Sequence, residues 1–185
     1  MRSRAALLGI GLMLLAAPLS GQRVQFGLGA GLAYPGRDFG ATVKLGTIAL
    51  ATVAYRVGES PVAIRVDGEY AELRGKPAAT FVFPRHRVRA LRLSAEYQYD
   101  GGDMESRLRA WAFGGIGAFY DEVDRGEPEI PPFGRTHPGV QLGIAAGYAL
   151  GSLKPFGELG YQTILQSGRN TKFFALTVGF RVGGH

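Results

Sequence analysis

The residues best suited to chemistry in this chain are a serine and a glutamate two positions apart, Ser94 and Glu96. A serine hydroxyl acts as a nucleophile only when a base, usually a histidine, lies next to it. The histidines are His86, His137 and His185, and the sequence places none of them beside Ser94. We therefore interpret Ser94 and Glu96 as members of a polar hydrogen-bonding network and predict no catalytic residue.

Two further segments resemble ligand sites in composition only. The glycines Gly27, Gly29 and Gly31 lack the spacing of a phosphate-binding loop, so we expect them to serve packing within a strand. An acidic segment matches no calcium-loop spacing and is interpreted as solvated; its carboxylates are Asp121, Glu122, Asp124, Glu127 and Glu129. Cysteine is absent, which excludes disulfides and thiolate metal sites. The sequence predicts no metal and no cofactor.

The elements that must position these side chains are β-strands. In the segment VAIRVDGEYAEL, residues 62–73, Val62, Ile64, Val66 and Tyr70 occupy one parity, and Arg65, Asp67 and Glu69 occupy the other. Such alternation is typical of a strand, because successive side chains point to opposite faces. Seven further segments are predicted as strands, at 24–34, 47–57, 89–99, 107–120, 140–150, 158–163 and 173–182.

The fifth of these eight strands does not follow the common pattern. If Arg109 faces the same side as the charges of the other strands, then Trp111 and Phe113 face that side too. A bulge near residues 114–115, or an Arg109 that reaches the membrane edge, would resolve the conflict. Its register is left open.

The N-terminus has the layout of a secretory signal peptide. Arg2 and Arg4 precede an apolar run over 5–17, which is followed by Pro18 and small residues. The run is shorter than the roughly 20 residues of a transmembrane helix, which is the alternative. We predict a signal peptide over 1–21 and a single exported domain over 22–185.

The links between the strands alternate in length. Short links at 58–61, 100–106 and 151–154 separate longer ones at 35–44, 74–87, 121–138 and 166–172. Outer-membrane barrels combine short periplasmic turns with long extracellular loops in this way. Tyrosines near the strand ends fit aromatic girdles; they are Tyr34, Tyr55, Tyr70, Tyr97, Tyr99, Tyr120 and Tyr148. We predict an all-β fold, a closed antiparallel eight-stranded transmembrane β-barrel with both termini in the periplasm. The alternative is a soluble lipocalin-like barrel with its apolar parity inside.

In the membrane barrel the charged parity faces the lumen. The predicted lumen network has four cations and four carboxylates: Arg56, Arg65, Asp67, Glu69, Arg92, Glu96, Glu158 and Arg181. Buried charges are tolerated when they are paired, and an eight-stranded barrel is just wide enough for side chains to fill. The sequence thus predicts a plugged lumen.

The chain resembles the OmpA/OmpX-like family of outer-membrane β-barrel domains. The resemblance rests on FGLGAGLAYPGRDFG after the signal peptide, FGGIGAFY, FGELGYQ and the closing TVGFRV, and it covers the whole mature chain. It implies the outer membrane as the location, delivery by the barrel assembly machinery, and no peptidoglycan-binding domain. The chain departs from the family by continuing past Phe180, where a terminal aromatic is usual.

A non-enzymatic structural or surface role is the predicted function. The alternatives are a small-solute pore and a lipid A-modifying enzyme, although the His and Ser spacing that deacylases share has no match here.

A basic segment could contact lipopolysaccharide phosphates, or simply keep an exposed loop soluble; its cations are Arg74, Lys76, Arg85, Arg87 and Arg89. The net charge of +6 comes without a basic helix, so no nucleic-acid partner is predicted. Nothing in the sequence sets the oligomeric state.

Overall fold

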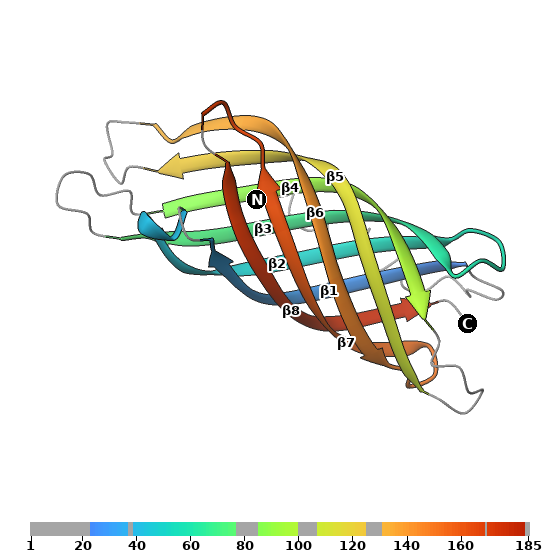
Figure 1. The fold of residues 1–185 in the computed structure, drawn as a ribbon. Coiled ribbons are helices and arrows are strands. Elements are labelled where there is room, and N and C mark those ends of the chain that lie inside the picture. The colour runs from blue at the N-terminus through green and yellow to red at the C-terminus, as the bar shows by residue number, and fades with distance from the viewer. Residues whose placement is uncertain are drawn as a thin grey trace, which may run out of the picture.

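Alternating segments of this chain pair into eight antiparallel strands that close into a barrel (Figure 1). The computed structural model describes residues 23–36, 39–76, 85–99, 107–124, 131–168 and 170–183, so the predicted signal peptide lies outside the described residues. The strands are β1 (Val24–Pro35), β2 (Val43–Arg56), β3 (Val62–Gly75), β4 (Arg85–Tyr99), β5 (Leu108–Asp124), β6 (Phe133–Tyr148), β7 (Leu153–Ile164) and β8 (Thr171–Gly183). The all-β, eight-stranded prediction is confirmed.

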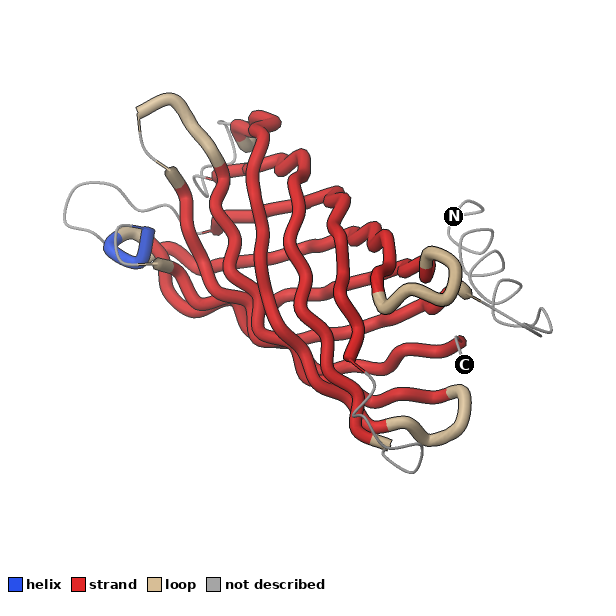
Figure 2. Tube along the Cα trace, turned by 45° about the vertical axis from the view of Figure 1, so that its right-hand side comes forward, coloured by secondary structure: helices blue, strands red, loops and turns tan. Residues whose placement is uncertain are grey.

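The barrel closes between its first and last strands. Pairing of β1 with β8 runs from Gln25 opposite Gly183 to Pro35 opposite Phe173. The tight turns at 57–61 and 149–152 therefore lie at the end where β1 begins and β8 finishes, and the longer links lie at the other end. A short 3-10 helix, η1 (Phe39–Ala41), lies at that longer-loop end, where Figure 2 shows it in blue. By the usual arrangement of outer-membrane barrels, the turn end is periplasmic and the loop end extracellular.

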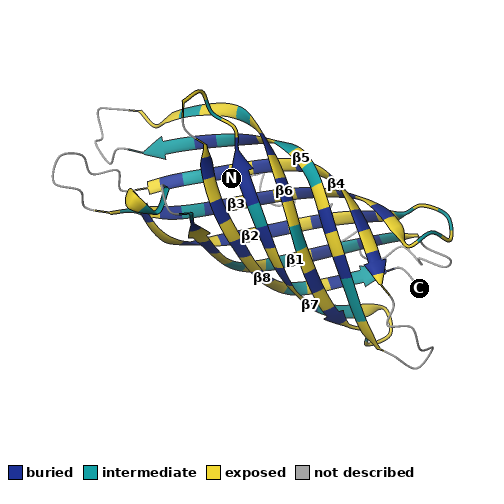
Figure 3. Cartoon of the chain, viewed as in Figure 1, coloured by how far each residue is buried: buried dark blue, intermediate teal, exposed yellow. Residues whose placement is uncertain are grey.

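Burial alternates residue by residue along the strands, as the blue and yellow bands of Figure 3 show. The exposed parity is apolar: Leu28, Leu91, Ile116 and Val178 each expose 65–69% of their surface. Exposed tyrosines border this apolar band, with Tyr34 near the loop end and Tyr55 near the turn end. A contiguous apolar surface of this kind requires a lipid environment. The molecule is thus built to span the outer membrane.

Strand β5 settles the register that the sequence left open. It pairs one residue to one residue with β4 and with β6, without a bulge at 114–115. Trp111 and Phe113 are buried and face the lumen, so the strand keeps a single parity throughout. The aromatic side chains depart from the common pattern because they stack on lumen arginines.

Several strands extend further than predicted, into segments taken for loops. β4 begins at Arg85, β5 continues to Asp124 and β6 begins at Phe133. β2 begins at Val43 and has an irregularity in its pairing between Val43 and Gly46. The strands therefore project beyond the apolar band at the extracellular end. No helix among the described residues is long and apolar enough to cross a membrane.

Candidate functional site: a filled lumen and a basic outer rim

The structure places the predicted charges inside the barrel. Arg56 is half-buried at the turn end. The other seven expose at most 7% of their surface: Arg65, Asp67, Glu69, Arg92, Glu96, Glu158 and Arg181. They come from β3, β4, β7 and β8, so the network connects opposite walls of the barrel.

Arg65 is the centre of the network. Its two terminal nitrogens each donate to one carboxylate oxygen of Glu158 at 2.9 Å, and its Nε donates to Asp67 at 2.7 Å. A longer contact of 3.4 Å joins it to Glu96. The planar guanidinium matches a carboxylate in this two-pronged geometry, which makes the pair both strong and directional.

Arg181 forms the second two-pronged pair, toward the turn end. Its terminal nitrogens donate to the two oxygens of Glu96 at 2.8 Å each. Gln98 donates to Glu96 at 2.7 Å and in turn accepts a hydrogen bond from Arg56. The network thus continues to the periplasmic mouth.

Toward the loop end the same network passes through Arg92. Its guanidinium lies 2.7 Å from Glu69 and 3.8 Å from Asp67. Two amides add hydrogen bonds, from Gln162 to Glu69 at 2.7 Å and from Gln141 to Asp67 at 3.1 Å. Amide N–H groups donate well to buried carboxylate oxygens and so add to the pairing that Arg92 provides.

Aromatic side chains of β5 cover the central arginines. The guanidinium of Arg65 lies 4.1 Å from the centre of the Phe113 ring, and that of Arg181 lies 4.2 Å from the centre of the Trp111 ring. Cation–π contacts of this kind are strengthened where water is excluded. A Cβ at Gly143 of β6 would collide with the Phe113 ring, and one at Gly147 would collide with the Pro155 carbonyl oxygen and crowd the Trp111 ring, so glycine leaves these rings their space.

The extracellular half of the lumen is filled by an apolar cluster that we did not predict. Its larger buried members are Val43, Ile48, Leu73, Val88, Phe119, Ile164 and Phe173, and Phe39 of η1 packs against it. A signal was present in the sequence, because near the loop ends both parities are apolar, as in Phe173 and Phe174. This cluster forms an apolar layer on the extracellular side of the charged one.

Ser94 and His86 have different partners in the structure. The Ser94 hydroxyl is buried and accepts a hydrogen bond from Gln141. His86 instead pairs with Asp121 at the loop end, where Gln166 also donates to Asp121 and the Phe39 ring contacts the imidazole edge. Within the described ranges, no group of three or more His, Cys, Asp or Glu side chains could hold a metal ion.

The predicted basic segment lies on strands rather than in a loop. Arg74 is on β3, and Arg85, Arg87 and Arg89 are on the outward face of β4, while Lys76 directly follows β3. We call these five residues, at the extracellular ends of β3 and β4, the basic rim. Residues 77–84 between the strands lie outside the described part of the chain. Of the predicted acidic segment, Asp121, Glu122 and Asp124 belong to β5, and Glu127 and Glu129 are not described.

Carboxylates of the neighbouring strands partly neutralise the basic rim. Arg87 donates to Glu122 at 2.8 Å and lies 3.7 Å from Glu72 and from Asp124. Arg89 lies 3.5 Å from Glu122, and its side chain is 54% exposed. Arg89 is therefore more available to an external anion than Arg87.

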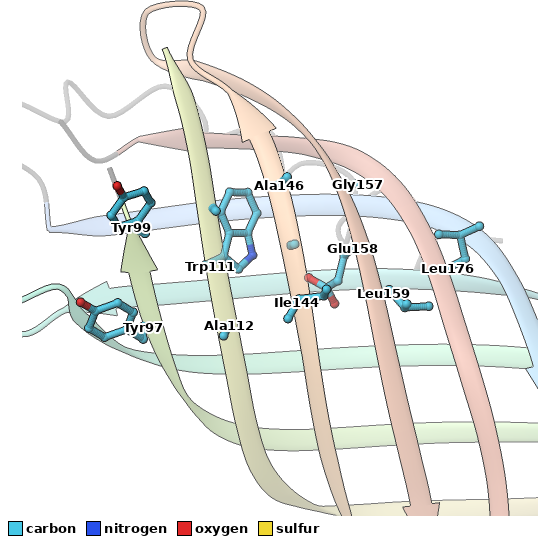
Figure 4. A pocket seen from close by; sticks show the side chains of 12 residues that line it. Tyr97, Tyr99, Trp111, Ala112, Ile144, Ala146, Gly157, Glu158, Leu159 and Leu176 are labelled. Carbon is cyan, nitrogen blue, oxygen red and sulfur yellow. The ribbon is translucent and has the colours of Figure 1, made fainter. Parts of the chain in front are cut away.

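Two grooves indent the apolar outer wall. The groove in the periplasmic half has a volume of about 620 Å³ and is shown in Figure 4, with Tyr97 and Tyr99 at one side and Leu159 and Leu176 at the other. The second, of about 690 Å³, lies in the extracellular half across β4, β5 and β6. Small residues are among those that line both grooves, such as Ala112 in the first and Ala118 in the second.

Comparison with solved structures finds the same fold in outer-membrane proteins. The match with Neisserial surface protein A covers 87% of this chain and 97% of that protein's chain, with 16% sequence identity and a TM-score of 0.65. The match with OprG from Pseudomonas aeruginosa covers 88% of this chain and 98% of the OprG chain, with 13% sequence identity and a TM-score of 0.58. The match with a major outer membrane protein from Thermus thermophilus covers 86% of this chain and 98% of that protein's chain, with 14% sequence identity and a TM-score of 0.56. At this identity the likeness establishes the fold. No family model matches the sequence, and no curated protein matches it.

Proposed function

We propose that this outer-membrane barrel is a sealed, non-enzymatic anchor that presents extracellular loops and contacts lipopolysaccharide through its basic rim. The observation that carries the proposal is the lumen, which is filled by an apolar layer above a paired charge network. A filled interior transmits no solute and leaves the extracellular end as the surface that can act.

The small-solute pore is the second candidate, since charged lumens line the channels of larger barrels. Here two buried arginines are held by carboxylates from the opposite wall, Arg65 by Glu158 and Arg181 by Glu96. Opening a path would require these pairs to separate in a water-poor interior. The geometry therefore favours the sealed anchor.

Single cysteines test both the seal and the orientation, because the natural chain has none. We expect S167C, on the β7–β8 loop, to react with a bulky membrane-impermeant maleimide in intact cells. E59C, on the β2–β3 turn, should react only after the outer membrane is permeabilised. S94C, in the buried lumen, should stay unreactive toward a small thiol reagent until the barrel is unfolded. Rapid labelling of folded S94C would contradict the sealed lumen, and labelling of E59C in intact cells would reverse the orientation.

A further inference from the structure

The groove in the extracellular half of the outer wall lies directly below part of the basic rim. Leu91 and Leu93 of β4, Ile116 and Ala118 of β5, and Pro138 and Val140 of β6 line it, and we call it the outer-leaflet groove. Its volume of about 690 Å³ falls within the range of small-molecule sites, about 300–1,000 Å³. It opens toward lipid.

Arg89 stands at the upper edge of this groove. It is two residues from Leu91 on the same outward face of β4, and its guanidinium lies 5.6 Å from the centre of the Tyr120 ring. Tyr120 in turn is two residues above Ala118 on β5. The Arg89 guanidinium thus lies next to the extracellular edge of the outer-leaflet groove, where Tyr120 and Glu122 contact it.

The surrounding rim adds charge of the same sign. Arg85 is exposed and pairs in register with Arg74 of β3, so two cations lie side by side on neighbouring strands. The outward-facing carboxylates near them are Glu72, Glu122 and Asp124, and all three contact Arg87 at 2.8–3.7 Å. Glu122 also lies 3.5 Å from Arg89, and Asp124 lies opposite Arg85 in the β4–β5 register. Arg74, Arg85 and Arg89 remain as the exposed arginines of the rim.

We propose that the outer-leaflet groove and Arg89 form one binding site for a phosphorylated glycolipid, the lipid A part of lipopolysaccharide. A phosphate is held by Arg89 with Arg85, and one acyl chain lies in the groove. This deepens the proposed function and depends on its lipopolysaccharide contact. Three properties select this occupant: the groove is apolar, it faces the outer leaflet, and cations border it at headgroup depth.

The test uses the mature chain, refolded in detergent and checked for folding by its shift on an unheated gel. The probe is purified hexa-acylated lipid A, with binding read by native mass spectrometry. A118F fills the groove, and R89Q removes the cation. A51F is the matched control, because Ala51 is also exposed on the lipid-facing wall but lies on β2, away from the groove. Phosphatidylglycerol serves as the competing anionic lipid.

We expect A118F and R89Q each to weaken lipid A binding by about fivefold or more, the size of losing one charge-assisted contact or one well-packed apolar segment. A51F should bind as the wild type does. Loss with R89Q alone would overturn the acyl groove and leave the proposed phosphate contact standing. Wild-type binding by both variants would overturn the site together with that contact. Equal binding of phosphatidylglycerol would overturn lipid A as the occupant.

Discussion

Replacing Arg65 by methionine should destabilise the barrel by about 3–5 kcal/mol, the usual cost of leaving buried charges without their partner. Methionine fills similar space but leaves Glu158 and Asp67 without the guanidinium that now pairs with both. The measurement is the midpoint of urea unfolding in lipid vesicles, followed by Trp111 fluorescence, with folding confirmed on unheated gels. R107M is the control, because Arg107 is exposed at the turn end and its loss should cost less than about 1 kcal/mol.

A second variant separates lost charge pairing from lost packing. The double variant R65M/E158M removes both members of the two-pronged pair. If an unpaired buried carboxylate causes the loss, the double variant should be more stable than R65M alone. Equal or greater loss in the double variant would show that pairing is not what the network contributes.

Truncating Phe119 to alanine should destabilise the barrel by about 3–5 kcal/mol, as expected for a large cavity in a packed core. Phe119 is fully buried in the apolar layer of the lumen, where it packs over Gly139 of β6. The same urea experiment measures the loss. I116A is the control on the same strand, since Ile116 is 66% exposed to lipid and leaves no cavity. Equal losses in the two variants would contradict a packed apolar layer.

The strands and their lumen-facing parity were predictable because both are local properties of the chain. Over residues 62–71 of β3 and 90–99 of β4, charges occupy only one parity, so alternation alone assigns Arg65 and Glu96 to the lumen. Their partners could not be predicted in the same way. Glu158 reaches Arg65 from across the barrel, and this meeting depends on the stagger of all the strands between them.

The apolar layer and the strand positions of the basic rim escaped prediction for a different reason. Alternation fades where both faces of a strand are apolar, as at Phe173, or where both are polar, as at Arg85 and His86. Such segments look like loops by pattern, yet backbone pairing with the neighbouring strand continues through them. Where strands project beyond the bilayer, no lipid contacts their outer face, so the alternation of apolar and polar residues that identifies a strand in the sequence is lost.

Planar-bilayer conductance tests most directly whether the lumen is sealed. Purified, folded protein would be added to a bilayer alongside a porin of known conductance as the positive control. We predict no stable conductance steps above those of the protein-free membrane, because the ion-paired and apolar layers leave no continuous water path. Reproducible ohmic channels of uniform size from the wild-type protein would contradict a sealed lumen and establish a pore in its place.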